Sequence, residues 1–339
     1  MKKVFFLISM TFLLSCQNSK EEANVFFLKG NKALENQNYN EAIKYYEEAV
    51  NKNPKLADAY NNLGVANKNQ NKNEEAIKNF QVAFSIDSKF NEAKLNLAEI
   101  KFKTQGEINE TYALLNEIEN EYIQNAKFCN LKGQIEFAKS DLEQSKIYLE
   151  KAIKLEPKNS FYISDLGTLF YQNKDYKKAI ELFSRSIQLN NTNTYAISNL
   201  GLSYFQLNDQ QTAKKYLVEA YQNNPKIISI SNNLAYFYLK TNELKLAFPI
   251  VNNSISIDKN DPWAIRNQGL YEIKAGNAET GLTNLLQAYD KTATIENIHT
   301  EIGQAYLTLM NKTKACEFWA KGKILGETES KSLELKNCN

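Results

Sequence analysis

The side chains best suited to chemistry in this chain are few and scattered. It has four cysteines and a single histidine, His299. The sequence has no phosphate-binding glycine loop, no Cys-x-x-Cys pair and no His-Glu-x-x-His metal signature. No activated Ser or Cys can be placed beside His299, so we expect this residue to have a structural role. We predict no enzymatic activity, no cofactor and no metal site.

Cys16 follows a short basic segment and an apolar segment at the start of the chain. Met1-Lys2-Lys3 is basic, Val4 to Leu14 is a mostly apolar run, and Leu13-Leu14-Ser15-Cys16 follows. The run is too short to span a bilayer and has the layout of a secretory signal. The last four residues resemble the lipobox of bacterial lipoproteins. This resemblance implies that residues 1–16 are a signal peptide ending in Cys16, which receives a diacylglycerol group; a core helix with a stray cysteine is the alternative.

Residues 17–22 are polar, which predicts a tether between the lipid and the first helix. Lys20-Glu21-Glu22 resembles the signal that sends some lipoproteins of the Bacteroidetes group to the cell surface, and a plain solvated linker is the alternative. Two or three acyl chains on one cysteine anchor a protein stably in a membrane. We expect a location in the bacterial cell envelope, most simply at the outer membrane, facing the periplasm or the exterior.

The charge balance bears on the choice of partner. Loss of Lys2 and Lys3 with the signal lowers Lys plus Arg from 41 to 39, which equals the 39 Asp plus Glu. A chain with no net charge has no general attraction for phosphate backbones or anionic headgroups. We therefore do not expect nucleic acid as a partner, and membrane attachment depends on the lipid.

Small residues recur at a nearly constant interval along the rest of the chain, and we call these positions the ladder. Its nine members stand 34 residues apart, with one step of 35: Gly30, Gly64, Ala98, Gly133, Gly167, Gly201, Ala235, Gly269 and Gly303. An alanine usually follows twelve residues later and a large apolar residue four beyond that, as in Ala76 and Phe80. Small residues let two helices approach, and large ones fill the space between them. A 34-residue period therefore predicts a solenoid of helical hairpins.

The clearest motif residues belong to the second and sixth repeats: Tyr60-x-x-Leu63-Gly64 with Ala76-x-x-x-Phe80, and Ile197-x-x-Leu200-Gly201-x-x-Tyr204 with Ala213 and Pro225. In these residues the chain resembles the tetratricopeptide repeat (TPR) family. The resemblance covers about residues 23–327 and implies an all-α solenoid of nine helix-turn-helix repeats. It further implies a right-handed superhelix whose concave face is lined by the first helix of each repeat.

Two repeats depart from the pattern. The third repeat is one residue longer than the others and has Glu110-Thr111 where the alanine is expected, so its second helix, around Tyr112 to Tyr122, is predicted to pack differently. The seventh repeat has Pro249 inside its second helix. Proline removes one backbone hydrogen bond of a helix, which predicts a kink near residues 245–249.

Residues 328–339 are predicted to form a polar helix that caps the last hairpin, because a terminal repeat needs a solvent-facing end. Cys316 and Cys338 are centred on the turn beside Gly326. Residues equidistant from the turn of an antiparallel helix pair face each other, and export permits oxidation. We predict a Cys316–Cys338 disulfide, with two unpaired thiols as the alternative; the end of the chain is also similar to that of exported Bacteroidetes repeat proteins. Cys129 is expected to be buried.

The best candidate binding residues lie on the expected concave face. An asparagine column stands two residues before the ladder positions: Asn62, Asn96, Asp165, Asn199, Asn233 and Asn267. Each Asn can both donate to and accept from the backbone of an extended peptide, or it can instead bond to neighbouring helices. Three aromatic residues, the aromatic row, stand six residues before the ladder: Phe161, Tyr195 and Trp263. Tyr171 and Phe205, four residues after it, are expected on the same face.

These expectations combine into one functional hypothesis. The chain is predicted to be a membrane-anchored scaffold of the cell envelope that binds a polypeptide segment in the concave groove of repeats four to eight. One alternative is a self-associating structural component whose groove holds a second copy. Another is a regulator of a cell-wall enzyme, or of a secretion or assembly machine.

Overall fold

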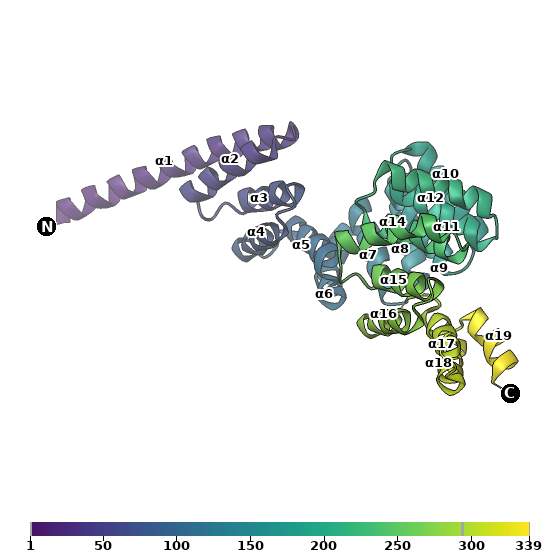
Figure 1. The fold of residues 1–339 in the computed structure, drawn as a ribbon. Coiled ribbons are helices and arrows are strands. Elements are labelled where there is room, and N and C mark those ends of the chain that lie inside the picture. Colours follow the sequence, from purple (N-terminus) through teal and green to yellow (C-terminus); the bar gives the residue numbers. More distant parts are fainter. Residues whose placement is uncertain (1, 293–294, 339) are drawn as a thin grey trace. The chain divides into compact units, whose positions relative to one another are not determined.

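The structure consists of stacked helical hairpins. The computed structural model describes the backbone of residues 2–292 and 295–338, and the side chains of residues 19–104, 106–292 and 295–338. This described part forms nineteen α-helices and no strand, in two compact units, Met1–Pro157 (unit 1) and Lys158–Asn339 (unit 2) (Figure 1). The prediction of an all-α solenoid of about nine hairpins, with one more helix after the last, is confirmed.

Unit 1 contains the first four hairpins. Its helices are α1 (Lys2–Glu35), α2 (Tyr39–Lys52), α3 (Ala57–Asn69), α4 (Asn73–Ile86), α5 (Asn91–Gln105), α6 (Ile108–Tyr122), α7 (Ala126–Ala138) and α8 (Leu142–Leu155). Each odd-numbered helix packs along the helix that follows it. In the first hairpin, for example, the face of α2 that includes Ala42 and Tyr46 is buried.

Unit 2 contains five hairpins and the final helix. Its helices are α9 (Ser160–Gln172), α10 (Tyr176–Leu189), α11 (Thr194–Gln206), α12 (Gln210–Asn223), α13 (Ile228–Lys240), α14 (Leu244–Ile257), α15 (Pro262–Lys274), α16 (Ala278–Lys291), α17 (Ile298–Thr308), α18 (Lys312–Ile324) and α19 (Thr328–Asn337). The last helix, α19, packs on α18 and also contacts α17.

The first helices of successive hairpins contact one another throughout unit 2 and in the first three hairpins of unit 1. In unit 2, α9 contacts α11, α11 contacts α13, α13 contacts α15 and α15 contacts α17. Among the described residues of unit 2, the second helices make close contact only with helices next to them in the chain. Elements on the inside of a curved stack are closer together than those on the outside. The first helices therefore form the inner face of unit 2.

The ladder positions are where the two helices of a hairpin approach most closely. A Cβ atom added to Gly64 on α3 would lie 2.6 Å from Cε1 of Phe80, whose ring is fully buried on α4. Even alanine would force this ring to move, so the close packing requires glycine at this place. The 34-residue pattern of small and large residues is thus a pattern of interlocking side chains.

The third hairpin takes up its extra residue in its first helix. α5 has 15 residues, whereas α3 and α7 have 13 each. The chain then turns through Gly106, whose φ of +66° is in the left-handed region that glycine adopts without strain. Thr111 takes the place of the usual alanine on α6; it is fully buried, and its hydroxyl donates to the carbonyl of Ala98 at 3.5 Å.

The seventh hairpin accommodates Pro249 without a break in the helix. α14 runs from Leu244 to Ile257 with Pro249 inside it. Pro249 is exposed, so the carbonyl of Lys245 that loses its donor can bond to water instead. The kink predicted at this place stays a prediction.

The first helix includes the segment predicted as a tether. α1 is continuous through residues 17–22, where Ser19 Oγ donates to the Lys52 carbonyl at 2.7 Å and Glu22 Oε2 lies 2.6 Å from Lys52 Nζ. The side chain of Cys16 lies outside the described residues, so its lipidation stays a prediction. Within the described part of the chain, no helix has both the length and the apolar character needed to cross a bilayer.

Candidate interaction surface

The asparagine column connects neighbouring hairpins. Five members of the column donate an amide hydrogen bond to the preceding first helix. Four of them bond to a side chain: Asn62 to Asn31 Oδ1 (2.9 Å), Asn96 to Asn61 Oδ1 (3.0 Å), Asn199 to Thr168 Oγ1 (3.4 Å) and Asn233 to Ser198 Oγ (3.0 Å). Asn267 donates to the backbone carbonyl of Asn232 at 2.9 Å. Asp165 has the equivalent place on α9. The sequence allowed these amides to bond either to neighbouring helices or to a peptide ligand. The structure contains the bonds to neighbouring helices, while contact of the column with a ligand stays a prediction.

The first helices of unit 1 carry a charge cluster around Glu99 on α5. The Glu99 carboxylate lies 3.0 Å from Lys68 Nζ, 2.8 Å from Lys127 Nζ and 2.7 Å from Lys103 Nζ. Burial by itself raises the pKa of Glu99, but the three ammonium groups outweigh it and hold the pKa well below its usual range. The cluster joins α3, α5 and α7 and neutralises its own anion.

The aromatic row stands exposed on unit 2. Phe161, Tyr195 and Trp263 are each the second residue of a first helix, on α9, α11 and α15, and are 54%, 52% and 44% exposed. Ser229 has the corresponding place on α13. Large aromatic side chains of this exposure, repeated on neighbouring hairpins, are the residue types that anchor protein–protein interfaces.

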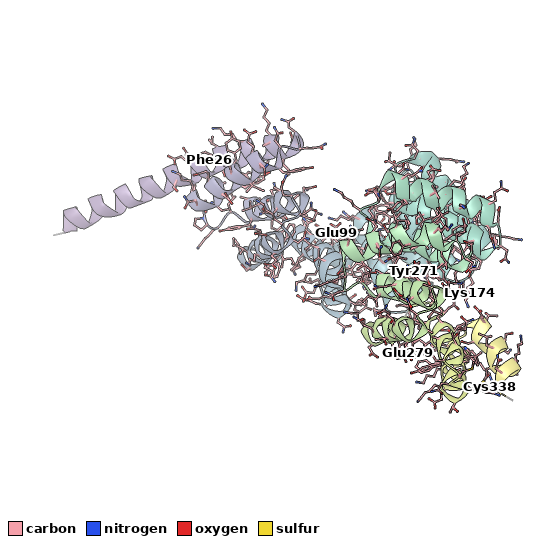
Figure 2. All side chains as sticks on the ribbon, viewed as in Figure 1. Phe26, Glu99, Lys174, Tyr271, Glu279 and Cys338 are labelled. Atoms are coloured by element: carbon pink, nitrogen blue, oxygen red, sulfur yellow. A yellow bond between two sulfur atoms is a disulfide. The ribbon has the colours of Figure 1, made fainter. Side chains whose placement is uncertain are left out.

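A cavity of about 790 Å³ lies within unit 2. One wall comes from the inner face, where Tyr171 on α9, Phe205 on α11 and Tyr236 on α13 line it. The other wall comes from two segments near the end of the chain, residues 295–299 and 325–329. Tyr171 and Phe205 therefore share one surface, as expected from their spacing. Lys174, labelled in Figure 2, lines the cavity as well, and its Nζ lies 3.5 Å from the Gly326 carbonyl.

A buried ion pair supports the cavity wall at Tyr236. Arg266 on α15 makes two parallel hydrogen bonds to Glu301 on α17, Nε to Oε2 at 2.7 Å and Nη2 to Oε1 at 2.6 Å. Its guanidinium also stacks on the Tyr236 ring, with Cζ 3.8 Å from the ring centroid. Burial raises the pKa of the Tyr236 hydroxyl, and the Arg266 charge opposes this rise. Such a bidentate, stacked arrangement suits arginine and not lysine.

Glu327 joins the final helix to the last hairpin. Its Oε1 accepts from the backbone N–H of His299 at 3.2 Å, and its Oε2 accepts from that of Thr300 at 2.8 Å. A carboxylate at the start of α17 satisfies free N–H groups and interacts favourably with the helix dipole. Burial raises the pKa of Glu327, but the hydrogen bonds outweigh it and leave the pKa below its ordinary value. His299 Nδ1 lies 2.9 Å from the same carboxylate, so His299 has a structural contact.

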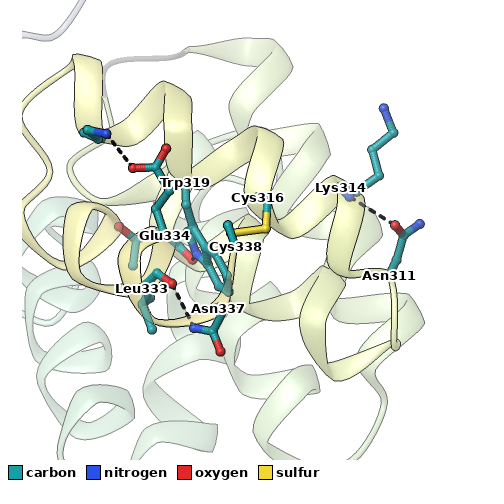
Figure 3. Close-up of a disulfide and its surroundings, with 10 residues drawn as sticks. Asn311, Lys314, Cys316, Trp319, Leu333, Glu334, Asn337 and Cys338 are labelled. Atoms are coloured by element: carbon teal, nitrogen blue, oxygen red, sulfur yellow. Dashed lines mark hydrogen bonds and ion pairs between the residues drawn. A yellow bond between two sulfur atoms is a disulfide. The ribbon is translucent and has the colours of Figure 1, made fainter.

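The far end of α19 is held covalently. Cys316 on α18 and Cys338, directly after α19, form a disulfide with their Cα atoms 5.8 Å apart (Figure 3). Near it, Lys323 Nζ lies 2.7 Å from Glu334 Oε2, and Trp319 donates its indole N–H to the Thr300 carbonyl at 3.2 Å. The sulfurs that the sequence spacing placed opposite each other are thus joined.

The remaining candidate groups are buried or scattered. Cys129 is fully buried on α7, its Sγ lies 3.3 Å from the Ile123 carbonyl, and burial raises the pKa of its thiol. Among the described side chains, no three His, Cys, Asp or Glu residues gather closely enough to hold a metal ion.

Comparison with known proteins identifies the repeats. A family model described as "TPR repeat" matches residues 30–71 and 167–208. Another, described as "Tetratricopeptide repeat", matches residues 57–90, 126–159 and 195–227. The chain contains tetratricopeptide repeats. A stretch of 138 residues is 32% identical to the small glutamine-rich tetratricopeptide repeat-containing protein 2 of Saccharomyces cerevisiae. This match spans 40% of the chain and 38% of the yeast protein.

Solved structures share the fold of these tetratricopeptide repeats. The structure titled "Crystal structure of APC/C hetero-tetramer Cut9-Hcn1" has a TM-score of 0.65 at 14% identity, covering 94% of this chain and 76% of that one. Pseudomonas aeruginosa pilF has a TM-score of 0.51 at 19% identity, covering 61% of this chain and 94% of that one. Human IFIT1, solved as a dimer with m7Gppp-AAAA, has a TM-score of 0.56 at 17% identity, covering 82% of this chain and 70% of that one. At these identities the likeness concerns the fold.

Sequence reasoning on the tetratricopeptide repeats missed the second wall of the cavity. The motif identifies inner-face positions such as those of Tyr171 and Phe205, but not the loop containing Glu296 or the segment at Gly326, which face them. The Arg266–Glu301 pair did leave a signal. Arg266 and Glu301 have opposite charges and stand 35 residues apart in the sequence, which is one repeat plus one residue. This spacing places them on the first helices α15 and α17 of successive hairpins.

Proposed function

We propose that this protein is a lipid-anchored scaffold of a bacterial cell envelope that holds an extended polypeptide segment of a partner on the inner face of unit 2. The tetratricopeptide repeats indicate a protein–protein interaction scaffold. The observation that carries the finer proposal is the aromatic row. Its side chains are about half exposed at the same position of three hairpins, where packing within the solenoid would have buried them.

The spacing of the row suits an extended chain. Neighbouring packed helices lie about 10 Å apart, so α9 and α15, three hairpins apart, are separated by roughly 30 Å along the inner face. An extended peptide advances about 3.3 Å per residue, so roughly nine residues of a partner span the row. Aromatic rings supply large contact area at low cost in side-chain entropy, so three such anchors support a specific contact.

Membrane attachment is the part of this proposal that rests on Cys16. A diacylglycerol thioether plus an amide-linked acyl chain exceeds the two-chain threshold for stable anchoring. Metabolic labelling with an alkyne fatty acid tests it. The wild-type chain should incorporate label and fractionate with membranes, and Cys16→Ala should lose both. Label retained by Cys16→Ala would refute lipidation at this residue.

Site-specific crosslinking in cells tests the groove. A photocrosslinking amino acid at Tyr195 should capture a discrete partner, whereas one at Gln211, an exposed residue of α12 on the second-helix side, should not. Identical background capture at both sites would reject the proposal. Capture of a second copy of the same chain at Tyr195 would instead establish self-association as the use of the groove.

A further inference from the structure

Unit 2 contains two places where tyrosine rings meet a carboxylate. At the first, the Tyr236 ring and the Glu301 carboxylate surround the guanidinium of Arg266. The ring supplies a negative π face and the carboxylate supplies the counter-charge, which together form a favourable site for a planar cation. The chain therefore fills this first place with its own arginine.

The second place lines the cavity. Tyr171 on α9 and Tyr176 on α10 form an edge-to-face pair with ring centroids 5.4 Å apart, and Glu296 lies on the facing wall. Within the described part of the chain, the Glu296 carboxylate has no hydrogen bond or ion pair, while its backbone carbonyl accepts from Arg266 at 3.3 Å. The combination of rings and carboxylate is the same as at the first place.

The cations of the chain that line the cavity are directed elsewhere. Lys174 Nζ approaches the Gly326 carbonyl at 3.5 Å, and Lys240 Nζ lies 3.8 Å from the Glu329 carboxylate. Both ammonium groups thus approach residues of the C-terminal wall, 325–329. Glu296 is left as the acidic group that faces the tyrosine pair without a counter-charge from the described side chains.

We propose that this cavity binds the guanidinium group of an arginine side chain carried by the polypeptide that lies on the inner face of unit 2. The inference rests on the proposed function for the source of the arginine. Arginine fits better than lysine, because a planar guanidinium can stack on a ring and bond a carboxylate through two N–H groups at once. Its long aliphatic stem reaches from a backbone on the inner face into the cavity and packs on the Phe205 ring, which lines the same space.

The electrostatics of the cavity agree with a cationic guest. Burial raises the pKa of the Tyr171 and Tyr176 hydroxyls, and the Glu296 charge raises both further. Burial disfavours a charge of either sign, whereas the Glu296 contribution reflects a negative potential that favours a cation at the same place. Tyr171 keeps its proton at any physiological pH, so the pair stays neutral and its rings remain good partners for a guanidinium.

The test uses N-acetyl-arginine amide as probe and N-acetyl-citrulline amide as its neutral isostere, added to the full chain in mild detergent at low salt. Ring-labelled tyrosine signals are followed by NMR and assigned with Tyr171→Phe and Tyr176→Phe. The arginine probe should shift both signals and bind roughly fivefold more tightly than the citrulline probe. Equal binding of the two probes, or shifts confined to other tyrosines, would overturn the proposal.

A matched pair of variants completes the test. Glu296→Gln should abolish the preference for the arginine probe, whereas Glu279→Gln should keep it, because Glu279 is an exposed residue of α16 outside the cavity lining (Figure 2). Unchanged preference in Glu296→Gln rejects the site. If the wild-type chain does not bind the arginine probe while specific crosslinking at Tyr195 is intact, only the cation site is rejected. If the wild-type chain shows no specific crosslinking at Tyr195, the groove function itself is rejected.

Discussion

The first helices of the two units are built on the same ladder but carry different kinds of side chain. On the first helices of unit 1, the half-buried carboxylate of Glu99 lies within 3.0 Å of three lysines. The first helices of unit 2 carry exposed aromatic rings, of which Tyr195 is 52% exposed. The Glu99 carboxylate already has its counter-charges, so it gains little from a partner, whereas exposed rings gain from burial. The same repeat thus carries a charge cluster on unit 1 and exposed rings on unit 2, and the proposed binding surface belongs to unit 2.

The buried charge of unit 2 allows the strongest test of this contrast. Glu301→Gln removes the counter-charge of Arg266 and should lower the free energy of unfolding of unit 2 by roughly 3–5 kcal/mol, because the guanidinium stays buried without it. Urea unfolding followed by tryptophan fluorescence measures this effect selectively, since Trp263 and Trp319, the two tryptophans of the chain, both belong to unit 2.

A double variant separates the charge effect from general damage. Arg266→Met with Glu301→Leu removes both charges and should recover most of the lost stability, because apolar residues of similar volume replace buried ion pairs at little cost. If the double variant is as unstable as Glu301→Gln, the ion pair is not what the single change disturbed.

The disulfide is the next largest contribution expected in unit 2. Cys338→Ser opens a loop with a sequence separation of 22 residues. In the chain-entropy model its loss lowers the stability of the C-terminal cap by about 3 kcal/mol. Trp319 reports this loss through its emission, because it lies on α18 three residues after Cys316 and bonds to Thr300.

Thiol counting checks the pairing independently. Unfolded under oxidising conditions, the lipidated chain should expose one reactive thiol, Cys129, and the Cys338→Ser variant should expose two. Three reactive thiols in the wild-type chain would contradict the disulfide, whatever the stability measurements give.

The charge cluster of unit 1 should show itself through pH. Because the folded-state pKa of Glu99 lies below its ordinary value of 4.5, its stabilisation is present above about pH 4.5 and is lost as the pH falls through the folded pKa. Glu99→Gln should therefore destabilise unit 1 by roughly 1–2 kcal/mol at neutral pH and by progressively less in acid. Thermal melts followed by circular dichroism measure the difference. Tryptophan emission from unit 2 is the internal control, and a constant difference down to pH 3 would argue against the charge network.

The fold was predictable from sequence because it follows from short-range packing rules. The spacing of Gly64, Ala76 and Phe80 determines how two helices of a hairpin meet, and this arrangement repeats along the chain. The cavity was not predictable in this way, because Glu296 and Gly326 reach it from hairpins far along the chain. Their position depends on the summed rotation of several repeats in unit 2. The sequence also did not determine whether each Asn amide bonds to a neighbouring helix or to a ligand, because the same side chain can do either, depending on the groups that surround it.

The smallest effect separates these two uses of the asparagine column. Asn233→Ala removes the 3.0 Å hydrogen bond to Ser198 and should cost about 1 kcal/mol of stability, with partner capture from a crosslinker at Trp263 unchanged. Tyr195→Ala should do the reverse, since an exposed ring contributes within about 0.5 kcal/mol to stability but anchors the partner. Urea unfolding and crosslinking yield, measured on both variants, give the answer. If Asn233→Ala abolishes capture at unchanged stability, the column contacts the partner directly, and the binding surface extends from the aromatic row onto the amides between the helices.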